Sequence, residues 1–312
     1  MSRVIVAGHL CLDIIPTFLT DNPAEPGQLV DTGESILSTG GAVSNVGLAL
    51  HKLGAEVTLV ARIGEDAFGN AIRERMQGLD QYLIRTPHGQ TSHSIVISQP
   101  GRDRTFLHHA GTNHLFGSGD LDFTNLPKAD WLHFGYPPLM RRMYADGGDE
   151  LADIFRRAKA AGLRTSLDMS QPDWKGESGK AHWPSILKKV LPHVDFFMPS
   201  EGEAHAVTDS NNPLEAAFKL GANQLILKCG GDGLFWWDGK KGHRQPIFPV
   251  EVVGTTGSGD ATIAGFIFGM TNGYSIEESM RIGCAVGACC CEAADAVSGV
   301  TSWEVTRKRF EL

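Results

Sequence analysis

The chain has 312 residues, of which 42% are hydrophobic and 21% charged, and its formal net charge is −8. A chain of this length and composition can bury the core of one α/β domain, alone or with a small appendage. The negative charge argues against nucleic acid as the main partner, because phosphate backbones favour basic proteins.

Neither a membrane span nor an export signal is visible in the sequence. No apolar run approaches the roughly 20 residues that cross a bilayer. The chain begins almost directly with a strand-like run and lacks the charged start and cleavage site of a signal peptide. Its six cysteines form no Cys-x-x-Cys pair, which favours reduced core thiols over zinc ligands or disulfides. We therefore expect a cytoplasmic protein with no membrane partner.

Short apolar runs bounded by turn residues recur along the chain, as is typical of strands buried on both faces of a parallel sheet. We predict strands at Val4–Ala7, Val57–Val60, Trp131–Phe134, Leu163–Leu167, Phe196–Met198 and Leu225–Leu227, and the end of another strand at 250–253. Apolar residues at helical spacing lie between them, for example in 43–53 and 151–158. This alternation predicts an α/β fold, a doubly wound and mostly parallel sheet with helices on both faces.

Two segments interrupt the alternation. Residues 12–38 are rich in Pro, Gly, Thr and Asp, and residues 88–113 contain two strand-like runs around the turn Gln99–Arg102. We predict that 12–38 and 88–113 form a small β-sheet lid over one end of the main sheet, within a single domain of residues 1–312. A long irregular excursion is the alternative. If the second segment is a strand, His108 and His109 face opposite sides of it.

The stretch Gly254-Thr-Thr-Gly-Ser-Gly-Asp260 precedes a helix that we predict over 261–270. Its glycines leave backbone N–H groups uncovered, and a helix N-terminus attracts phosphate oxygens. The spacing is close to that of a P-loop, but Asp260 stands where the P-loop has lysine. A carboxylate cannot neutralise a phosphate, yet it can accept the proton of a hydroxyl that attacks one. The stretch therefore predicts phosphoryl transfer.

Two other interpretations of this stretch remain. Asp260 is also suited to be an ordinary carboxylate in the first turn of a helix. A dinucleotide-binding fingerprint is disfavoured because Thr262 stands where its third glycine belongs.

Taken together, these motifs resemble the ribokinase-like (PfkB) carbohydrate kinase family, from Gly8 to about Gly299. The resemblance is carried by Thr255–Asp260, by Gly40–Asn45 with Arg62–Gly69 downstream, and by Gly8-x-x-x-x-Asp13. It implies a Rossmann-like domain with a β-sheet lid, through which members often form homodimers. It also implies ATP-dependent phosphorylation of a hydroxyl group on a sugar or sugar-like molecule, with Mg²⁺.

The resemblance implies a role for each motif. Asp260 would be the general base, and the amides of Gly257, Ser258 and Gly259 would form the anion hole for the transferred phosphoryl group. By the same resemblance, the substrate site would be made of Asp13, Gly40, Gly41, Asn45 and Asp168, and carboxylate and amide groups suit substrate hydroxyls. Glu203 would organise water around the magnesium of the nucleotide. The candidates for nucleotide contacts are Lys228, Gly230, Gly233 and Thr256.

Several of these residues also suit a purely structural role. Asp13 and Asn45 also suit turns and helix caps, and Glu203 also suits a solvated helix face. Lys228 closes a predicted buried strand and needs an anionic partner, which is either the nucleotide or another side chain. Ser200 stands where the family usually has asparagine, so this part of the motif departs from the pattern.

The substrate end is the least defined part. Arg141 and Arg142 follow a predicted strand, where they suit either an acidic substrate or the start of a surface helix. His108 and His109 are expected to be exposed in the lid. Gly254 stands where many relatives have an aspartate that helps to bind a monovalent cation, so we expect weak or absent potassium activation.

The alternatives to a sugar kinase are a nucleoside kinase and a sensor without catalysis. A nucleoside kinase would need an apolar or aromatic slot near the lid, for which Phe106 and Phe116 are available. A sensor that binds sugar or nucleotide without catalysis is disfavoured by the intact glycine turn and Asp260. The sequence does not identify the sugar, the phosphorylated hydroxyl or the oligomeric state.

Overall fold

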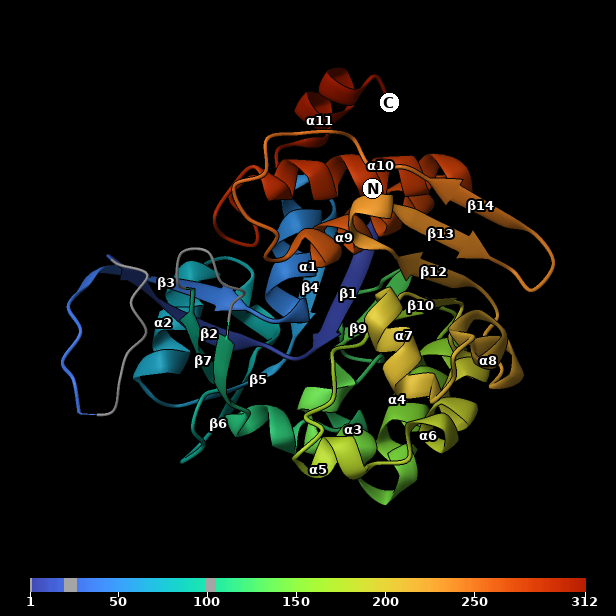
Figure 1. Ribbon diagram of the computed structural model, residues 1–312. Coiled ribbons are helices and arrows are strands. Elements are labelled where there is room, and N and C mark those ends of the chain that lie inside the picture. Colours follow the sequence, from blue (N-terminus) through green and yellow to red (C-terminus); the bar gives the residue numbers. More distant parts are fainter. Residues whose placement is uncertain (1, 20–26, 99–104) are drawn as a thin grey trace.

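The structure is a computed structural model that describes residues 2–19, 27–98 and 105–312 (Figure 1). Its body contains an eight-stranded sheet in the order β14-β13-β12-β11-β10-β9-β1-β4. The neighbours from β4 to β12 run parallel, whereas β13 and β14 are antiparallel at one edge. These strands are β1 (Arg3–Gly8), β4 (Glu56–Val60), β9 (Trp131–Gly135), β10 (Arg164–Leu167), β11 (Phe196–Phe197), β12 (Leu225–Lys228), β13 (Leu234–Trp237) and β14 (Gly242–Gln245).

Helices cover both faces of this sheet (Figure 1), and β1 explains why. Val4 and Val6 join a buried cluster with α1, α9 and α10, whereas Ile5 and Ala7 join a second cluster with α4 and α6. Successive side chains of a strand point to opposite faces, so a strand buried on both faces is apolar throughout. The helices are α1 (Ala42–Lys52), α2 (Ala67–Arg75), α3 (Arg141–Tyr144), α4 (Asp149–Ala160), α5 (Glu177–Lys180), α6 (Trp183–Val190), α7 (Glu201–Thr208), α8 (Pro213–Lys219), α9 (Ser258–Thr271), α10 (Ile276–Cys291) and α11 (Trp303–Phe310).

These elements confirm the predicted fold class. The six strands that were predicted with both ends all lie where their apolar runs placed them. The predicted strand end at 250–253 is wrong. All of residues 246–257 are described, and none of them belongs to a strand. Val252 and Val253 are 61% and 62% exposed. Val252, together with Val250, lines a cavity that is described below.

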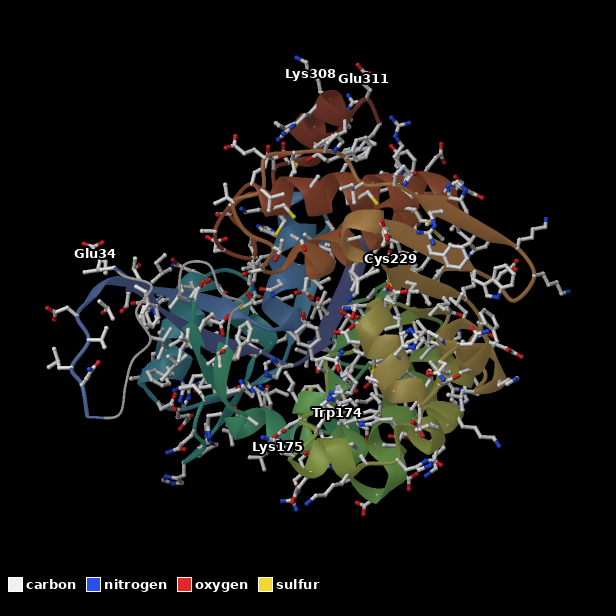
Figure 2. All side chains as sticks on the ribbon, in the orientation of Figure 1. Glu34, Trp174, Lys175, Cys229, Lys308 and Glu311 are labelled. Carbon is white, nitrogen blue, oxygen red and sulfur yellow. The ribbon has the colours of Figure 1, made fainter. Side chains whose placement is uncertain are left out.

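A second sheet forms the lid beside the body (Figure 1). Its strand order is β3-β2-β7-β8, with β2 (Cys11–Phe18), β3 (Thr32–Gly40), β7 (His93–Ile97) and β8 (Thr105–His109). Two short strands, β5 (Arg62–Gly64) and β6 (Ile84–Thr86), pair separately. Glu34 of β3 marks the side of the lid that points away from the body (Figure 2). The predicted turn Gln99–Arg102 lies outside the described residues.

The strand register gives the two faces of the lid different chemistry. Asp13 pairs with Ser38 and Ser94, and Ser94 pairs with His108, which makes one polar row across all four strands. One residue further along each central strand, Ile14 and Ile95 lie in a row with Leu37 and Leu107. Because neighbouring residues of a strand face opposite ways, this apolar row lies on the face away from Asp13.

The described residues bear on three features: cysteines, membrane spans and metal ligands. All six cysteines are free thiols, as the sequence predicted. Within residues 2–19, 27–98 and 105–312, no helix is both long enough and apolar enough to cross a membrane. The same residues contain no group of three or more His, Cys, Asp or Glu side chains that could hold a metal ion by themselves.

Candidate active site

The glycine turn before α9 places Asp260 in the first turn of this helix. Gly257 precedes the helix with a φ of 72°, which is the left-handed region that glycine favours. A Cβ at position 257 would also collide with Ala296. The amides of a first helical turn have no partner within the helix; the Ser258 amide donates to the Thr255 carbonyl at 3.3 Å. The predicted helix start and its carboxylate are therefore present together.

Asp260 is only 3% exposed and accepts hydrogen bonds from two distant segments. The amide Nδ2 of Asn45, in the first turn of α1, donates to Oδ2 at 2.9 Å. The hydroxyl of Tyr136 donates to both carboxylate oxygens at 2.8 Å. Burial raises the pKa of Asp260, and the charge of Lys228 with these two donors opposes the rise. Asp260 is thus a buried carboxylate with a proton affinity above that of an ordinary aspartate.

Tyr136 is a site residue that the sequence analysis missed. It directly follows β9 and adopts a φ of 64° and a ψ of 44°, a left-handed conformation that costs a non-glycine residue about 1 kcal/mol or more. The residue after it is Pro137, before which extended backbone is usual. The available signal was the sequence Gly-Tyr-Pro-Pro at the carboxyl end of a central strand, where α/β sheets hold their ligands.

The residues predicted to hold substrate hydroxyls meet where the lid joins the body. A Cβ at position 40 would collide with the carboxylate of Asp13, and a Cβ at position 41 would lie 2.5 Å from Nδ1 of His9. Gly40 and Gly41 therefore allow these two polar groups to approach the backbone that leads into α1. Burial raises the pKa of Asp13, and hydrogen bonds from Cys11 and Ser94 oppose the rise.

His9 and His108 connect the body to the lid. Nε2 of His9 lies 3.3 Å from Nε2 of His108, and Nδ1 of His108 lies 3.0 Å from the hydroxyl of Ser94. His9 is 2% exposed, and burial holds its pKa well below the ordinary value. His108 therefore lies on the Asp13 face of the lid, although its residue as a whole is exposed. His109 pairs with His93 on the opposite face, as the strand alternation predicted.

Lys228 has an anionic partner within the protein. Its Nζ lies 2.6 Å from Oδ1 of Asp168, and the two side chains are 12% and 1% exposed. Burial raises the pKa of Asp168. Burial acts against the charge of Lys228, but the carboxylates of Asp168 and Glu203 outweigh it and raise the lysine pKa. The anionic partner of Lys228 within the protein is therefore Asp168. Their ion pair lies beside Gly259 in the first turn of α9.

Glu203 and Ser200 form a capping box at the start of α7. The amide of Ser200 donates to Oε2 of Glu203 at 2.7 Å, and the amide of Glu203 donates to Oγ of Ser200 at 3.3 Å. This accounts for the serine that departs from the family pattern. Ser200 also pairs with Lys228 as an isolated parallel bridge, so the start of α7 with the Glu203 carboxylate lies beside the Lys228 strand.

A cavity of about 610 Å³ opens on the other side of the α9 N-terminus. Apolar side chains make up much of its wall, which includes Ile247 and, from the segment wrongly predicted to be a strand, Val250 and Val252. Figure 2 shows Cys229, the residue after Lys228, near the middle of the molecule. The polar part of the wall comes from Lys228, Gly230, Gly231, Gly233, Thr255, Ser258 and Gly259.

Most of the predicted nucleotide residues thus line one cavity. Gly230 and Gly233 adopt φ values of 55° and 87°, and a Cβ at position 233 would collide with the carbonyl of Gln245. Thr256 itself is not among the described lining residues, whereas its neighbour Thr255 is. The carbonyl of Thr256 instead accepts a weak hydrogen bond from the thiol of Cys290 at 3.3 Å.

Three further candidates are paired or buried. Arg141 and Arg142 begin the short helix α3, where they form ion pairs with Glu177 and Glu150, as expected for the start of a surface helix. Phe116 is fully buried in the core cluster around β9 and α4. It is therefore unavailable for a purine, whereas Phe106 in the lid is 52% exposed.

Comparison with known proteins gives the same assignment throughout the chain. The sequence profile of the family described as "pfkB family carbohydrate kinase" matches residues 1–303. The chain is 28% identical to fructoselysine 6-kinase of Shigella flexneri, over 92% of this chain and 97% of the relative. It is 25% identical to cytidine kinase of Thermococcus kodakarensis, over 91% and 94%. The structure of Arabidopsis thaliana ribokinase complexed with ribose and ATP superposes with a TM-score of 0.81 at 23% identity and covers all of both chains.

Proposed function

The chain belongs to the pfkB family of carbohydrate kinases, and from this membership we propose that it transfers the γ-phosphoryl group of ATP to a sugar hydroxyl with Asp260 as base. The observation that carries the proposal is the place of Asp260. It is buried between Asn45, which borders the lid, and the glycine turn that lines the 610 Å³ cavity. A base is needed at this meeting point of acceptor and phosphate.

Phosphoryl transfer forms one bond to the γ-phosphorus and breaks another. The substrate oxygen forms a bond to the γ-phosphorus while its O–H bond breaks, and the proton passes to a carboxylate oxygen of Asp260. The bond between the γ-phosphorus and the β,γ-bridging oxygen breaks, and ADP leaves with that electron pair. Amides of the first turn of α9, together with Lys228, are suited to stabilise the charge on the transferred group.

The residues around Asp13 support the acceptor end of this proposal. Asp13, Asn45 and the backbone at Gly40 and Gly41 offer acceptors and donors of the kind that adjacent hydroxyls need. The neighbouring His9 is buried and has a depressed pKa, so it stays neutral and can donate or accept. We therefore propose a hydroxyl-rich acceptor for this end of the site.

The nucleotide end would be formed by the cavity beyond α9. Apolar walls near Ile247 and Val252 suit a flat base, and the Gly230 and Gly233 turn lets the backbone approach phosphate oxygens. Mg²⁺ keeps several waters and needs only one or two carboxylates besides phosphate oxygens. Glu203 is partly exposed and lies near the ion pair of Lys228, so it fits this role. The metal would neutralise charge on the phosphates.

The test is turnover of the Asp260→Asn variant. Asparagine keeps the shape and loses the proton acceptor, so kcat should fall by at least ~10²-fold with little change in ATP affinity. ADP release is measured with ATP, Mg²⁺ and four acceptors that the relatives suggest, namely ribose, fructose, fructoselysine and cytidine. Asp209→Asn, on the exposed end of α7, is the matched control. Turnover by Asp260→Asn at the rate of the wild type refutes the role of Asp260.

The same assay separates the two remaining functions. The similarity to a cytidine kinase and the exposed Phe106 favour a nucleoside acceptor as the second candidate. It is supported if cytidine gives ADP at a higher kcat/KM than the sugars. A sensor without catalysis is supported if an acceptor binds saturably and no ADP appears.

We also propose that the lid mediates a homodimer. The apolar row Leu37–Ile14–Ile95–Leu107 lies on the face of the lid away from Asp13. Leu107 is 54% exposed and Leu37 is 42% exposed. A sheet face with such side chains is a natural surface for a second copy of the chain.

A further inference from the structure

We infer that Tyr136 is a positioning residue that holds Asp260 in its reactive orientation and keeps it ionised, an inference that rests on the proposed function. The first observation is the bond pattern. Oδ2 of Asp260 accepts from Asn45 and from Tyr136, whereas Oδ1 accepts from Tyr136 alone. Two donors from different segments fix the plane of the carboxylate, and Oδ1 keeps the greater capacity to accept a further proton.

The backbone of Tyr136 is the second observation. Its left-handed φ of 64° before a proline is unfavourable. The residue lies between the buried strand β9 and the buried Pro137 and Pro138, and its carbonyl accepts a hydrogen bond from the amide of Leu139 at 3.0 Å. Strained backbone of this kind persists where the surroundings enforce it, and here the result is a phenol aimed at one carboxylate. A tyrosine that served only to fill space would need neither the strain nor the two 2.8 Å bonds.

The charges around Asp260 explain why such a donor is needed. Burial favours the neutral acid, which cannot act as a base. Lys228 on β12 opposes protonation, but its charge is shared with Asp168, and Glu203 on α7 acts in the unfavourable direction. Asn45 and Tyr136 are the uncharged donors that face the carboxylate. The Tyr136 pKa is raised far above its usual value by burial and by Asp260, so the phenol keeps its proton and remains a donor.

The sign of the pH effect follows. The Tyr136 hydroxyl stabilises the ionised form of Asp260, so its removal raises the pKa of Asp260. The acid limb of kcat/KM, which reports the free enzyme, then moves to higher pH. A bond to a charged group that is lost without replacement corresponds to a displacement of about one pH unit or more. At neutral pH the misaligned base should lower kcat by roughly tenfold or more.

The experiment compares Tyr136→Phe with wild type and with Tyr144→Phe, a matched loss of one phenol whose ring packs near Trp183, outside the site. The kcat/KM of the best acceptor in the panel is measured from pH 5 to 9, and ATP affinity is measured separately. We expect the acid limb to move upward in Tyr136→Phe alone, with ATP affinity changed by less than about threefold. An acid limb that coincides with wild type overturns the inference, whatever the rate.

A second measurement does not depend on turnover. The carboxylate band of Asp260 is identified as the infrared difference between wild type and Asp260→Asn, and it is titrated in the wild-type and the Tyr136→Phe backgrounds. The apparent pKa should be higher without the phenol, and an equal or lower value contradicts the inference. If Asp260→Asn retains turnover, the proposed role of Asp260 as the base fails, and if wild type releases no ADP with any acceptor, the proposed kinase function fails. If Asp260→Asn is inactive while Tyr136→Phe titrates like wild type, only the role of Tyr136 fails.

Discussion

The geometry of the site around Asp260 and Asp13 depends on glycines as well as on the side chains that contact the two carboxylates. Gly257 permits the left-handed turn that begins α9, and Gly40 leaves the space that the carboxylate of Asp13 occupies. An alanine at either position would place a Cβ against Ala296 or Asp13. The glycines of the two family signatures are therefore steric requirements of this site, and their motifs could be found from sequence for that reason.

Gly254 leads to a prediction about potassium. Glycine provides no carboxylate here, and a Cβ at position 254 would lie 2.9 Å from the carbonyl of Ala293, so the backbone leaves little room for a side chain. Replacing K⁺ by Na⁺ or tetramethylammonium at constant ionic strength should change kcat by no more than about twofold, because a cation site needs several oxygen ligands. The measurement is the initial rate at saturating ATP and Mg²⁺. A large increase specific to K⁺ contradicts the prediction.

At the scale of elements, α9 and α10 are packed close together so that the turn before α9 is held firmly. A Cβ at Gly265 of α9 would lie 2.9 Å from Cα of Gly283 and 2.9 Å from the carbonyl of Ile282, both on α10. Small residues at such a crossing let two helices approach. The position of Asp260 therefore depends on contacts about one and a half turns further along the same helix.

Gly265→Ala should destabilise the protein by about 1–3 kcal/mol, because an added methyl group forces the two helices apart. The free energy of unfolding is measured by urea denaturation. Gly119→Ala is the control, since no atom lies within 4 Å of the added Cβ and its φ is not in the left-handed region. Equal stability of Gly265→Ala and wild type would show that the helices separate without cost.

The elements that the sequence predicted correctly share one physical property. Strands such as β1 and β9 are buried on both faces, so their sequences are short and almost entirely apolar, with the buried His133 as the exception in β9. The run at 250–253 looks similar although Val250 and Val252 line a cavity. A run of apolar residues does not reveal which apolar surface it contacts. Tyr136 belongs to no motif, because its role depends on Asp260, 124 residues away. The partner of Lys228 was left open for the same reason.

At the scale of the whole molecule, the same four strands of the lid form two surfaces of different chemistry. The polar row with Asp13 and His108 faces the body, and the apolar row with Ile14 and Leu107 faces away. This division depends on the strand register, since a shift by one residue would exchange the two rows. The pairing of β2 with β3 and β7 therefore fixes both surfaces together.

The dimer is tested by Leu107→Glu, which places a charge in the apolar row. Wild type should have the mass of a dimer in analytical ultracentrifugation, and the variant should have the mass of a monomer at the same concentration, because an unpaired charge at an interface is costly. Val305→Glu is the control. Val305 is 53% exposed and belongs to α11, and Lys308 of α11 and the following Glu311 lie far from the lid (Figure 2). A monomeric wild type, or a variant that stays dimeric, contradicts the proposal.

The hydrogen bonds of Asp260 have a consequence for the protein under stress. Asn45 and Tyr136 are 215 and 124 residues away from it along the chain, so no short fragment contains the assembled carboxylate. If either donor segment loosens, a buried acid remains without its donors and takes up a proton. With the roles proposed above, phosphoryl transfer would then stop while the cavity beyond α9 is still intact, so we expect catalytic activity to be lost before nucleotide binding.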